Sequence, residues 1–400
     1  MKKLTLLLIC IFILTGCQNQ SVLPGDETPV DSSAEIDVTG FQKEMNSQHP
    51  SRLSAVCKTE VGYYLHYDGL LYFLDGTTGN MTAVCAKPEC DHTYIDCNAW
   101  INSGMISYYQ GKLYYVNSDA KSDSMKTLYS VELDGTNHTK IQRLQLEYAE
   151  YRLVLADPIL VNGYLYFLEG DTQIYTVRLG EDVSKAVLLF EDDMTHTLES
   201  SWKFWADGGE IYAMNHILDD AGYYQDILYR LGLTEADTRM IWRSTELDIS
   251  ARDPSWYITD GHLYYYSPGN DLWDIELETD NAEKMIALTD TIKSETALFT
   301  DSYVLFESGK GITVYDYSGN ILGEVNLSSI FEKYSDAVRS SPVFADGNCV
   351  YLLVYRRTDN SASTLFYQVA WDKGSVYEVT NWPGANVKYD NTPSEIWQIG

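Results

Sequence analysis

Basic residues are scarce in this chain, and their scarcity excludes whole classes of partner. The sequence holds 28 Lys and Arg against 58 Asp and Glu in 400 residues, which gives a formal net charge of −30. A surface this negative repels phosphate backbones, so we expect no nucleic-acid partner. It also disfavours simple electrostatic docking on anionic lipids.

The chain also lacks long apolar runs and the common catalytic motifs. After the first 16 residues, no apolar stretch reaches the length of a membrane-spanning helix. The sequence contains no G-x-S-x-G elbow, H-E-x-x-H helix, phosphate-binding G-x-x-x-x-G-K-[ST] loop or full EF-hand spacing. Hydrophobic residues nevertheless make up 45% and aromatic residues 13%, so wholesale disorder is excluded. No motif identifies an enzyme, and a non-enzymatic binding protein is favoured.

The first segment has the features of a targeting signal. Lys2 and Lys3 precede an apolar run over residues 4–14, which is too short to span a bilayer comfortably. The run ends in Leu-Thr-Gly-Cys at residues 14–17, which resembles the lipobox of bacterial lipoproteins. In that family the cysteine thiol is acylated with diacylglycerol and the chain is cut just before it. The alternative is an ordinary secretory signal in which Cys17 is incidental.

The lipobox resemblance implies a domain organisation and a location. Residues 1–16 would be a signal peptide, and residues 17–50 a polar, flexible tether that begins with lipidated Cys17. Residues 51–400 would form the folded domain. Two or three acyl chains anchor a protein stably. We therefore expect attachment to the extracytoplasmic face of a bacterial cell membrane through the N-terminal lipid.

A short signature recurs through the rest of the chain. It consists of a turn residue, usually followed by glycine, then an aliphatic and one or more aromatic residues. Clear copies begin at Asp68, Gln110, Asn162, Gly208 and Asp260, and weaker copies begin at Asp301 and Asp346. Positions 69 and 347 lie 278 residues apart (347 − 69), which is six intervals of about 46. This regular spacing indicates an internal repeat.

Each full copy of the repeat contains four strand-like pieces. In the clearest copy these are residues 159–161, 164–168, 173–179 and 186–190. The first two meet at Asn162 and Gly163, a strong hairpin signal. Four strands per ~45 residues, repeated about seven times, are typical of propeller blades. We therefore predict an all-β fold, a β-propeller of seven four-stranded blades, with at most a short helix at residues 329–339.

Closure of the ring is the irregular part of the pattern. The first copy offers strands at residues 63–67, 70–74 and 81–85, followed by a cysteine-rich loop where a fourth strand would stand. Either residues 51–57 or the C-terminal residues 395–399 could supply that strand. Such a strand would join the two ends of the chain and remove exposed sheet edges.

Three of the five cysteines expected in the mature chain lie close together with a histidine. Cys85, Cys90, His92 and Cys97 have the spacing C-x4-C-x-H-x4-C, which could set a tetrahedral site because zinc prefers thiolate and imidazole ligands. An extended chain would be needed for Cys90 and His92 to point the same way. Outside the cytoplasm, nearby cysteines usually form disulfides. A structural zinc site, one or two disulfides and free thiols all remain open.

The cysteine-rich stretch also carries a family resemblance. The lipobox, the blade signature and Cys-Ala-Lys-Pro-Glu-Cys-Asp-His at residues 85–92, with Cys-Asn-Ala at 97–99, resemble uncharacterised propeller lipoproteins of gut-type Firmicutes. The resemblance covers nearly the whole mature chain and implies a surface-exposed propeller, without an activity. Residues 74–79 are similar to a turn of quinoprotein-type blades. The other blades lack that turn, so a quinone cofactor is not supported.

Other candidate residues are scattered and have ordinary structural uses. We expect surface positions rather than catalytic bases for His138, His196, His216 and His262. Four tryptophans could form a carbohydrate platform or, more commonly, pack between blades: Trp202, Trp205, Trp256 and Trp273. The acidic pairs at 192–193 and 219–220 could bind calcium, although solvated turns are the commoner use.

Three functions are compatible with a tethered propeller. We favour a binding module that recognises a glycan, a peptide or a protein through loops over the central channel. The first alternative is an extracytoplasmic carbohydrate-active enzyme, a hydrolase or a lyase, with carboxylates gathered at the channel. The second is a scaffold for other envelope proteins. The fold serves all three and does not choose between them.

Overall fold

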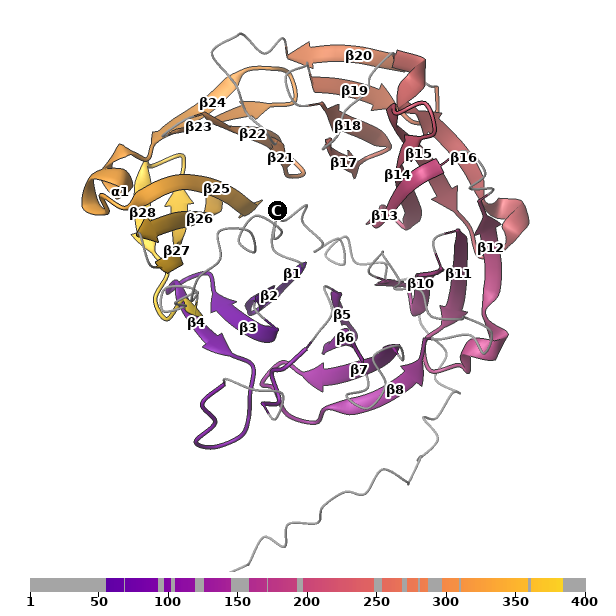
Figure 1. Cartoon of the computed structure of the whole chain (residues 1–400), viewed down its shortest axis with the longest axis horizontal. Coiled ribbons are helices and arrows are strands. Elements are labelled where there is room, and N and C mark those ends of the chain that lie inside the picture. Colours follow the sequence, from indigo (N-terminus) through magenta and orange to yellow (C-terminus); the bar gives the residue numbers. More distant parts are fainter. Residues whose placement is uncertain are drawn as a thin grey trace, which may run out of the picture. The chain divides into compact units, whose positions relative to one another are not determined.

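The computed structural model describes residues 55–67, 69–92, 97–101, 105–118, 126–144, 158–170, 172–192, 197–247, 254–267, 272–279, 281–286, 297–308, 311–358 and 361–383. Their strands form seven four-stranded antiparallel sheets arranged in a ring, each a consecutive run of four strands (Figure 1). The first strand of each sheet lies toward the middle of the ring and the fourth lies at its rim (Figure 1). The fold is a seven-bladed β-propeller, so the prediction from the repeat is confirmed.

The blades follow one another along the chain. Blades one to four are β1 (Ala55–Thr59), β2 (Gly62–Tyr67), β3 (Leu70–Asp75), β4 (Asn80–Ala83); β5 (Ile106–Tyr109), β6 (Lys112–Ser118), β7 (Lys126–Glu132), β8 (Thr139–Arg143); β9 (Ile159–Val161), β10 (Tyr164–Glu169), β11 (Gln173–Arg178), β12 (Val187–Glu191); β13 (Thr197–Asp207), β14 (Glu210–Asp219), β15 (Tyr224–Leu231) and β16 (Arg239–Arg243). Blades five to seven are β17 (Ser255–Thr259), β18 (His262–Tyr266), β19 (Leu272–Glu276), β20 (Asn281–Ile286); β21 (Ala297–Phe299), β22 (Tyr303–Ser308), β23 (Gly311–Asp316), β24 (Ile321–Asn326); β25 (Ala337–Asp346), β26 (Cys349–Thr358), β27 (Ser361–Ala370) and β28 (Ser375–Glu378).

Helices are short in the part of the chain that the structure describes. One α-helix, α1 (Ser328–Lys333), connects blades six and seven, in agreement with the short helix predicted there. The 3-10 helices η2 (Val183–Lys185), η4 (Glu235–Asp237) and η5 (Ser244–Leu247) lie between or after outer strands. Among the described helices, none has the length and apolar content needed to cross a bilayer.

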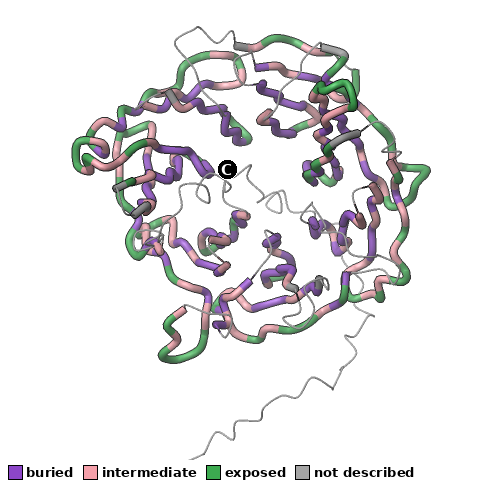
Figure 2. The backbone as a smooth tube through the Cα atoms, viewed as in Figure 1, coloured by how far each residue is buried: buried purple, intermediate pink, exposed green. Residues whose placement is uncertain are grey.

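Packing between blades explains the consecutive apolar residues of the inner strands. Leu165 to Leu168 of β10 and Leu263 to Tyr266 of β18 are buried at every position. Neighbouring blades therefore cover both faces of these strands. The outer strand β24 instead exposes Ile321 and Leu322. Figure 2 shows the same gradient, with buried residues concentrated on the inner strands and exposed residues at the rim.

The turns inside each blade follow from a few residue types. Asn162 and Gly163, between β9 and β10, both have positive φ, as a type I′ hairpin turn requires. A different turn, between the third and fourth strands, is closed by an aspartate. The carboxylates of Asp75, Asp134 and Asp316 each accept a backbone N–H from two residues later. Hydrogen bonds from nearby side chains and then from the backbone hold the pKa of all three carboxyl groups below the usual value.

Within the residues that the structure describes, contacts between two complete blades close the ring. The Tyr63 hydroxyl of blade one donates to the Asp346 carboxylate of blade seven at 2.5 Å, and the Lys58 ammonium pairs with the same carboxylate at 2.9 Å. The Met81 N–H donates to the Thr380 carbonyl at 3.2 Å, within a short parallel bridge that follows β28. These contacts join the two ends of the ring across blades one and seven.

Of the two segments proposed as the missing strand of blade one, residues 51–57 can be compared with the structure and residues 395–399 cannot. Blade one contains four strands of its own, because β1 (Ala55–Thr59) pairs with β2 and overlaps the segment 51–57 that the sequence offered. The fourth strand, β4, ends at Ala83, before the cysteine-rich loop. Residues 395–399 lie outside the described residues, as do Cys17, the signal segment and the tether.

Candidate metal centre

The structure brings the three clustered cysteines and the histidine together. They lie in the connection from β4 to β5, between blades one and two, and Figure 1 shows its violet first part projecting from the rim after β4. The Sγ atoms of Cys85, Cys90 and Cys97 and one ring nitrogen of His92 all lie within 4.8 Å of one another. All four site residues predicted from the sequence pattern therefore belong to one cluster.

The spacing of the cluster suits a tetrahedral metal site. Zinc–sulfur bonds of about 2.3 Å and zinc–nitrogen bonds of about 2.1 Å place tetrahedral ligand atoms about 3.6–3.8 Å apart. The Nδ1 atom of His92 lies 3.4 Å from Cys97 Sγ, close to that distance. None of the five described cysteines forms a disulfide. The donor set fits zinc, and its ligand atoms are gathered within 4.8 Å of one another, so small shifts would bring them to tetrahedral spacing.

The backbone reaches this arrangement by turning twice. Pro88 and Glu89 form a turn between the first two cysteines, as the sequence suggested. Glu89 and His92 have φ of 59° and 55°, the left-handed region that residues with a Cβ rarely adopt. The expectation that Cys90 and His92 need an extended chain to point together is therefore wrong. The left-handed residue at 92 turns its imidazole back toward the thiols.

The thiols of the cluster occupy different environments. Burial acts against ionisation of Cys85, but hydrogen bonds from the backbone N–H groups of Lys87 and Asn98 outweigh it and lower its pKa. Burial raises the pKa of the Cys97 thiol to about 12, although the Ala99 N–H donates to its sulfur at 3.4 Å. A bound cation would supply the stabilisation that the Cys97 thiolate lacks.

Both ends of the cysteine loop are attached to neighbouring blades. The Leu71 N–H donates to the Ala99 carbonyl at 2.8 Å, and the Ile101 N–H donates to the Gly69 carbonyl at 2.9 Å. On the other side, Gly135 in the last turn of blade two lies against the backbone of Val84, where a Cβ would come within 2.8 Å of it. A crosslink inside the loop therefore fixes a segment that connects two blades.

The other candidates from the sequence are mostly used in packing. Trp202, Trp205 and Trp256 are buried, and the Trp205 indole N–H donates to the Ile258 carbonyl of blade five at 2.9 Å. They therefore pack between blades and do not form an exposed platform. Asp219 caps its own turn by accepting the Tyr223 N–H, as expected for a turn residue.

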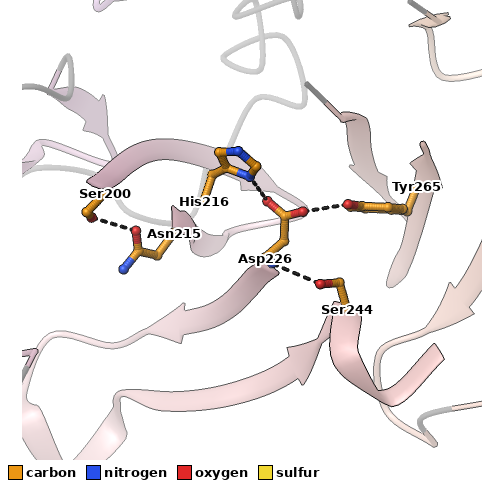
Figure 3. Close-up of polar contacts among 6 residues, drawn as sticks. All are labelled: Ser200, Asn215, His216, Asp226, Ser244 and Tyr265. Atoms are coloured by element: carbon orange, nitrogen blue, oxygen red, sulfur yellow. Dashed lines mark hydrogen bonds and ion pairs between the residues drawn. The ribbon is translucent and has the colours of Figure 1, made fainter. Parts of the chain in front are cut away.

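Blades four and five share a polar network that was not among the candidate sites predicted from the sequence. Asp226 of β15 is 1% exposed; its carboxylate accepts the Tyr265 hydroxyl of β18 at 2.5 Å and the ring N–H of His216 at 2.8 Å (Figure 3). Its own N–H donates to the Ser244 hydroxyl at 2.9 Å. Asn215 lies beside this group and accepts the Ser200 hydroxyl (Figure 3). Asp226 and Tyr265, which join the two blades, are both buried, and we assign the network to interblade cohesion.

His216 and His262, which were expected at the surface rather than as catalytic bases, are both partly exposed, and each pairs with an aspartate. His262 pairs with Asp274 at 2.7 Å in a half-exposed site, whereas His216 pairs with the buried Asp226. A sequence signal for the buried pair exists, because Asp226 directly precedes the apolar run Ile-Leu-Tyr of a core strand. An acid in that position is buried only when it is paired.

Comparisons with known proteins support the propeller fold and assign nothing else. No family model matches the chain, and no curated protein matches it. Among solved structures, a prolyl endopeptidase has 14% identity and a TM-score of 0.53 over 85% of this chain and 52% of that chain. Prolyl oligopeptidase B from Galerina marginata has 11% identity and a TM-score of 0.52 over 89% of this chain and 53% of that one.

An oligogalacturonate lyase from Vibrio parahaemolyticus is also similar, with 8% identity and a TM-score of 0.46 over 67% of this chain and 74% of that chain. The chain spans about half the length of the two prolyl peptidase chains it matches. At these identities the likeness establishes the propeller fold alone, because one fold carries many activities.

Proposed function

We propose that Cys85, Cys90, His92 and Cys97 bind one zinc ion with a structural role. The observation that carries this proposal is the convergence of four protein ligands within 4.8 Å. Four protein ligands close the coordination of zinc, whereas catalytic zinc keeps one position open for water or substrate. A single disulfide would use two of the three thiols and leave the third thiol and the imidazole without a role. Zinc uses all four groups.

Metal content and thiol content together test the zinc site. The full chain, purified without chelator, is expected to carry one zinc ion per molecule by elemental analysis. After denaturation with chelator, the mature chain should release five reactive thiols, one for each described cysteine. Absence of metal with three thiols (5 − 2) would establish a disulfide instead. Absence of metal with five thiols would leave the cysteines reduced and would refute the zinc site.

We propose further that the protein is a lipid-anchored binding module on the extracytoplasmic face of a bacterial membrane. The support for the anchor is the lipobox-like sequence that ends at Cys17. The support for binding rather than catalysis is the closed ligand set of the metal centre, together with the use of Asp226 and the turn aspartates in structural hydrogen bonds.

Replacement of Cys17 tests the anchor. In the full chain expressed in a bacterium, Cys17→Ser is expected to abolish acylation, because the hydroxyl cannot replace the thiol that receives the lipid. The measurement is the mass of the N-terminal peptide, combined with the distribution of protein between membrane and soluble fractions. Cys10→Ser, in the preceding apolar run, is the matched control and should stay acylated. Acyl-modified peptide from the Cys17→Ser chain would refute the anchor.

A further inference from the structure

A cleft of about 580 Å³ opens between blades three and four. Its walls include Tyr164 and Tyr166 of β10, Glu210 of β14, Arg230 of β15 and Arg239 of β16. Its volume lies within the range of small-molecule binding sites. The cleft lies in a different part of the ring from the cysteine cluster, so it is independent of the metal centre.

A long connection in blade four builds one wall of this cleft. β15 ends at Leu231 and β16 begins at Arg239, whereas in blade one β3 ends at Asp75 and β4 begins at Asn80. The extra residues form η4, which packs against β12 of blade three. The insertion therefore reaches across the gap between two blades.

The inserted loop is held in one conformation by its own hydrogen bonds. The Thr234 hydroxyl donates to the Asp237 carboxylate at 2.6 Å, and the Thr238 hydroxyl donates to the Thr234 carbonyl at 3.1 Å. At Gly232 a Cβ would come within 2.2 Å of the Asp237 Cβ, so only glycine allows the loop to close. A wall that is already ordered reduces the entropy lost on binding a ligand.

The charged groups of the cleft are arranged for a ligand rather than for stability alone. Arg230 and Arg239 lie directly opposite each other on paired strands, a like-charge arrangement that is unfavourable in a sheet. Arg230 pairs with Glu210. Arg239 is exposed and forms no ion pair with a described residue. Its guanidinium is thus available for an acceptor.

The composition of the lining selects a neutral ligand rich in hydroxyl groups. The two arginines are balanced by Glu210 and Asp237, and the net charge of −30 on the chain repels anions. Hydroxyl groups both accept from guanidinium and donate to carboxylate. Leu233, which is 47% exposed, and Tyr164 provide apolar surface for the carbon-bound hydrogens of a sugar ring.

We propose that the cleft between blades three and four binds a short neutral saccharide, with Tyr164 and Leu233 against the ring and Arg239 and Asp237 at its hydroxyls. This inference rests on the proposed binding function and names its ligand class and site. It places recognition at an interblade cleft, whereas the sequence placed it at loops over the central channel.

The test uses the full chain in detergent, with cellobiose, maltose and digalacturonate as probes in titration calorimetry or ligand-observed NMR. We expect binding of at least one neutral disaccharide. Tyr164→Ala and Arg239→Ala should each weaken it about tenfold or more, as loss of a central contact does. The matched control is Tyr377→Ala, on the outer strand β28, where an exposed tyrosine lies outside the cleft. That variant should bind as the unchanged chain does.

Each contrary outcome has a distinct meaning. Equal affinity in the cleft variants and the control refutes the cleft but leaves a binding module. Binding of digalacturonate alone, or of no saccharide in the panel, refutes the neutral-sugar assignment. Cleavage of a bound disaccharide supports the site but contradicts a non-enzymatic function. Tyr164→Ala could reduce the melting temperature and so weaken binding indirectly. Arg239→Ala removes an exposed side chain and should leave the melting temperature unchanged, so it tests the cleft independently.

Discussion

Asp226→Ala is expected to lower the free energy of unfolding by about 3–5 kcal/mol, the largest effect of any single substitution proposed for this propeller. Two donors lose their acceptor together: the buried Tyr265 hydroxyl and the Nδ1–H of His216, whose side chain is 23% exposed. Each orphaned donor costs about 1–3 kcal/mol, and truncation adds a small cavity. Chemical denaturation of the full chain, followed by tryptophan fluorescence, measures the change.

The half-exposed pair in blade five is the natural control for this prediction. Asp274→Ala removes the acceptor of His262, but solvent replaces it there, so the loss should stay below about 1 kcal/mol. Tyr265→Phe removes the hydrogen bond to the Asp226 carboxylate while His216 still donates to it, and should cost about 1.5–3 kcal/mol. If Asp226→Ala destabilised no more than Asp274→Ala, the network would not hold blades four and five together.

The fold could be predicted from the sequence because the blades repeat the same turn and strand pattern. The Asn162-Gly163 type I′ turn and the apolar second strand recur at about 46-residue spacing, and packing against neighbours makes that strand apolar on both faces. The aspartates that cap the turns after β3, β7 and β23 recur in the same way.

The sites were predictable only where they are local. Cys85, Cys90, His92 and Cys97 fall within one short segment, so their spacing revealed the cluster, although not the left-handed backbone at His92. By contrast, Asp226 and Tyr265 are 39 positions apart in different blades. The residues of the cleft span positions 162 to 239. Contacts between blades depend on how two sheets pack, and no residue spacing encodes that packing.

Removal of zinc is expected to destabilise the full chain by about 3–4 kcal/mol, the stabilisation given by a ligand present at 100–1,000 times its dissociation constant. The physical reason is that the metal crosslinks the loop whose ends are hydrogen-bonded to Leu71 and Gly69 at the start of β3. Without it, the left-handed residues Glu89 and His92 lose the constraint that holds them. A strong chelator should lower the melting temperature, and added zinc should restore it.

Cys97→Ser should reproduce the effect of the chelator and abolish any further response to it, because this buried thiol is replaced by a poor zinc ligand. Cys349→Ser, a half-buried cysteine of β26 outside the cluster, should keep both the metal and the response. A reductant separates zinc from a disulfide: reductant lowers the melting temperature only if a disulfide is present, and chelator does so only if zinc is bound. Sensitivity to reductant with indifference to chelator would therefore assign the cluster to a disulfide and exclude the metal.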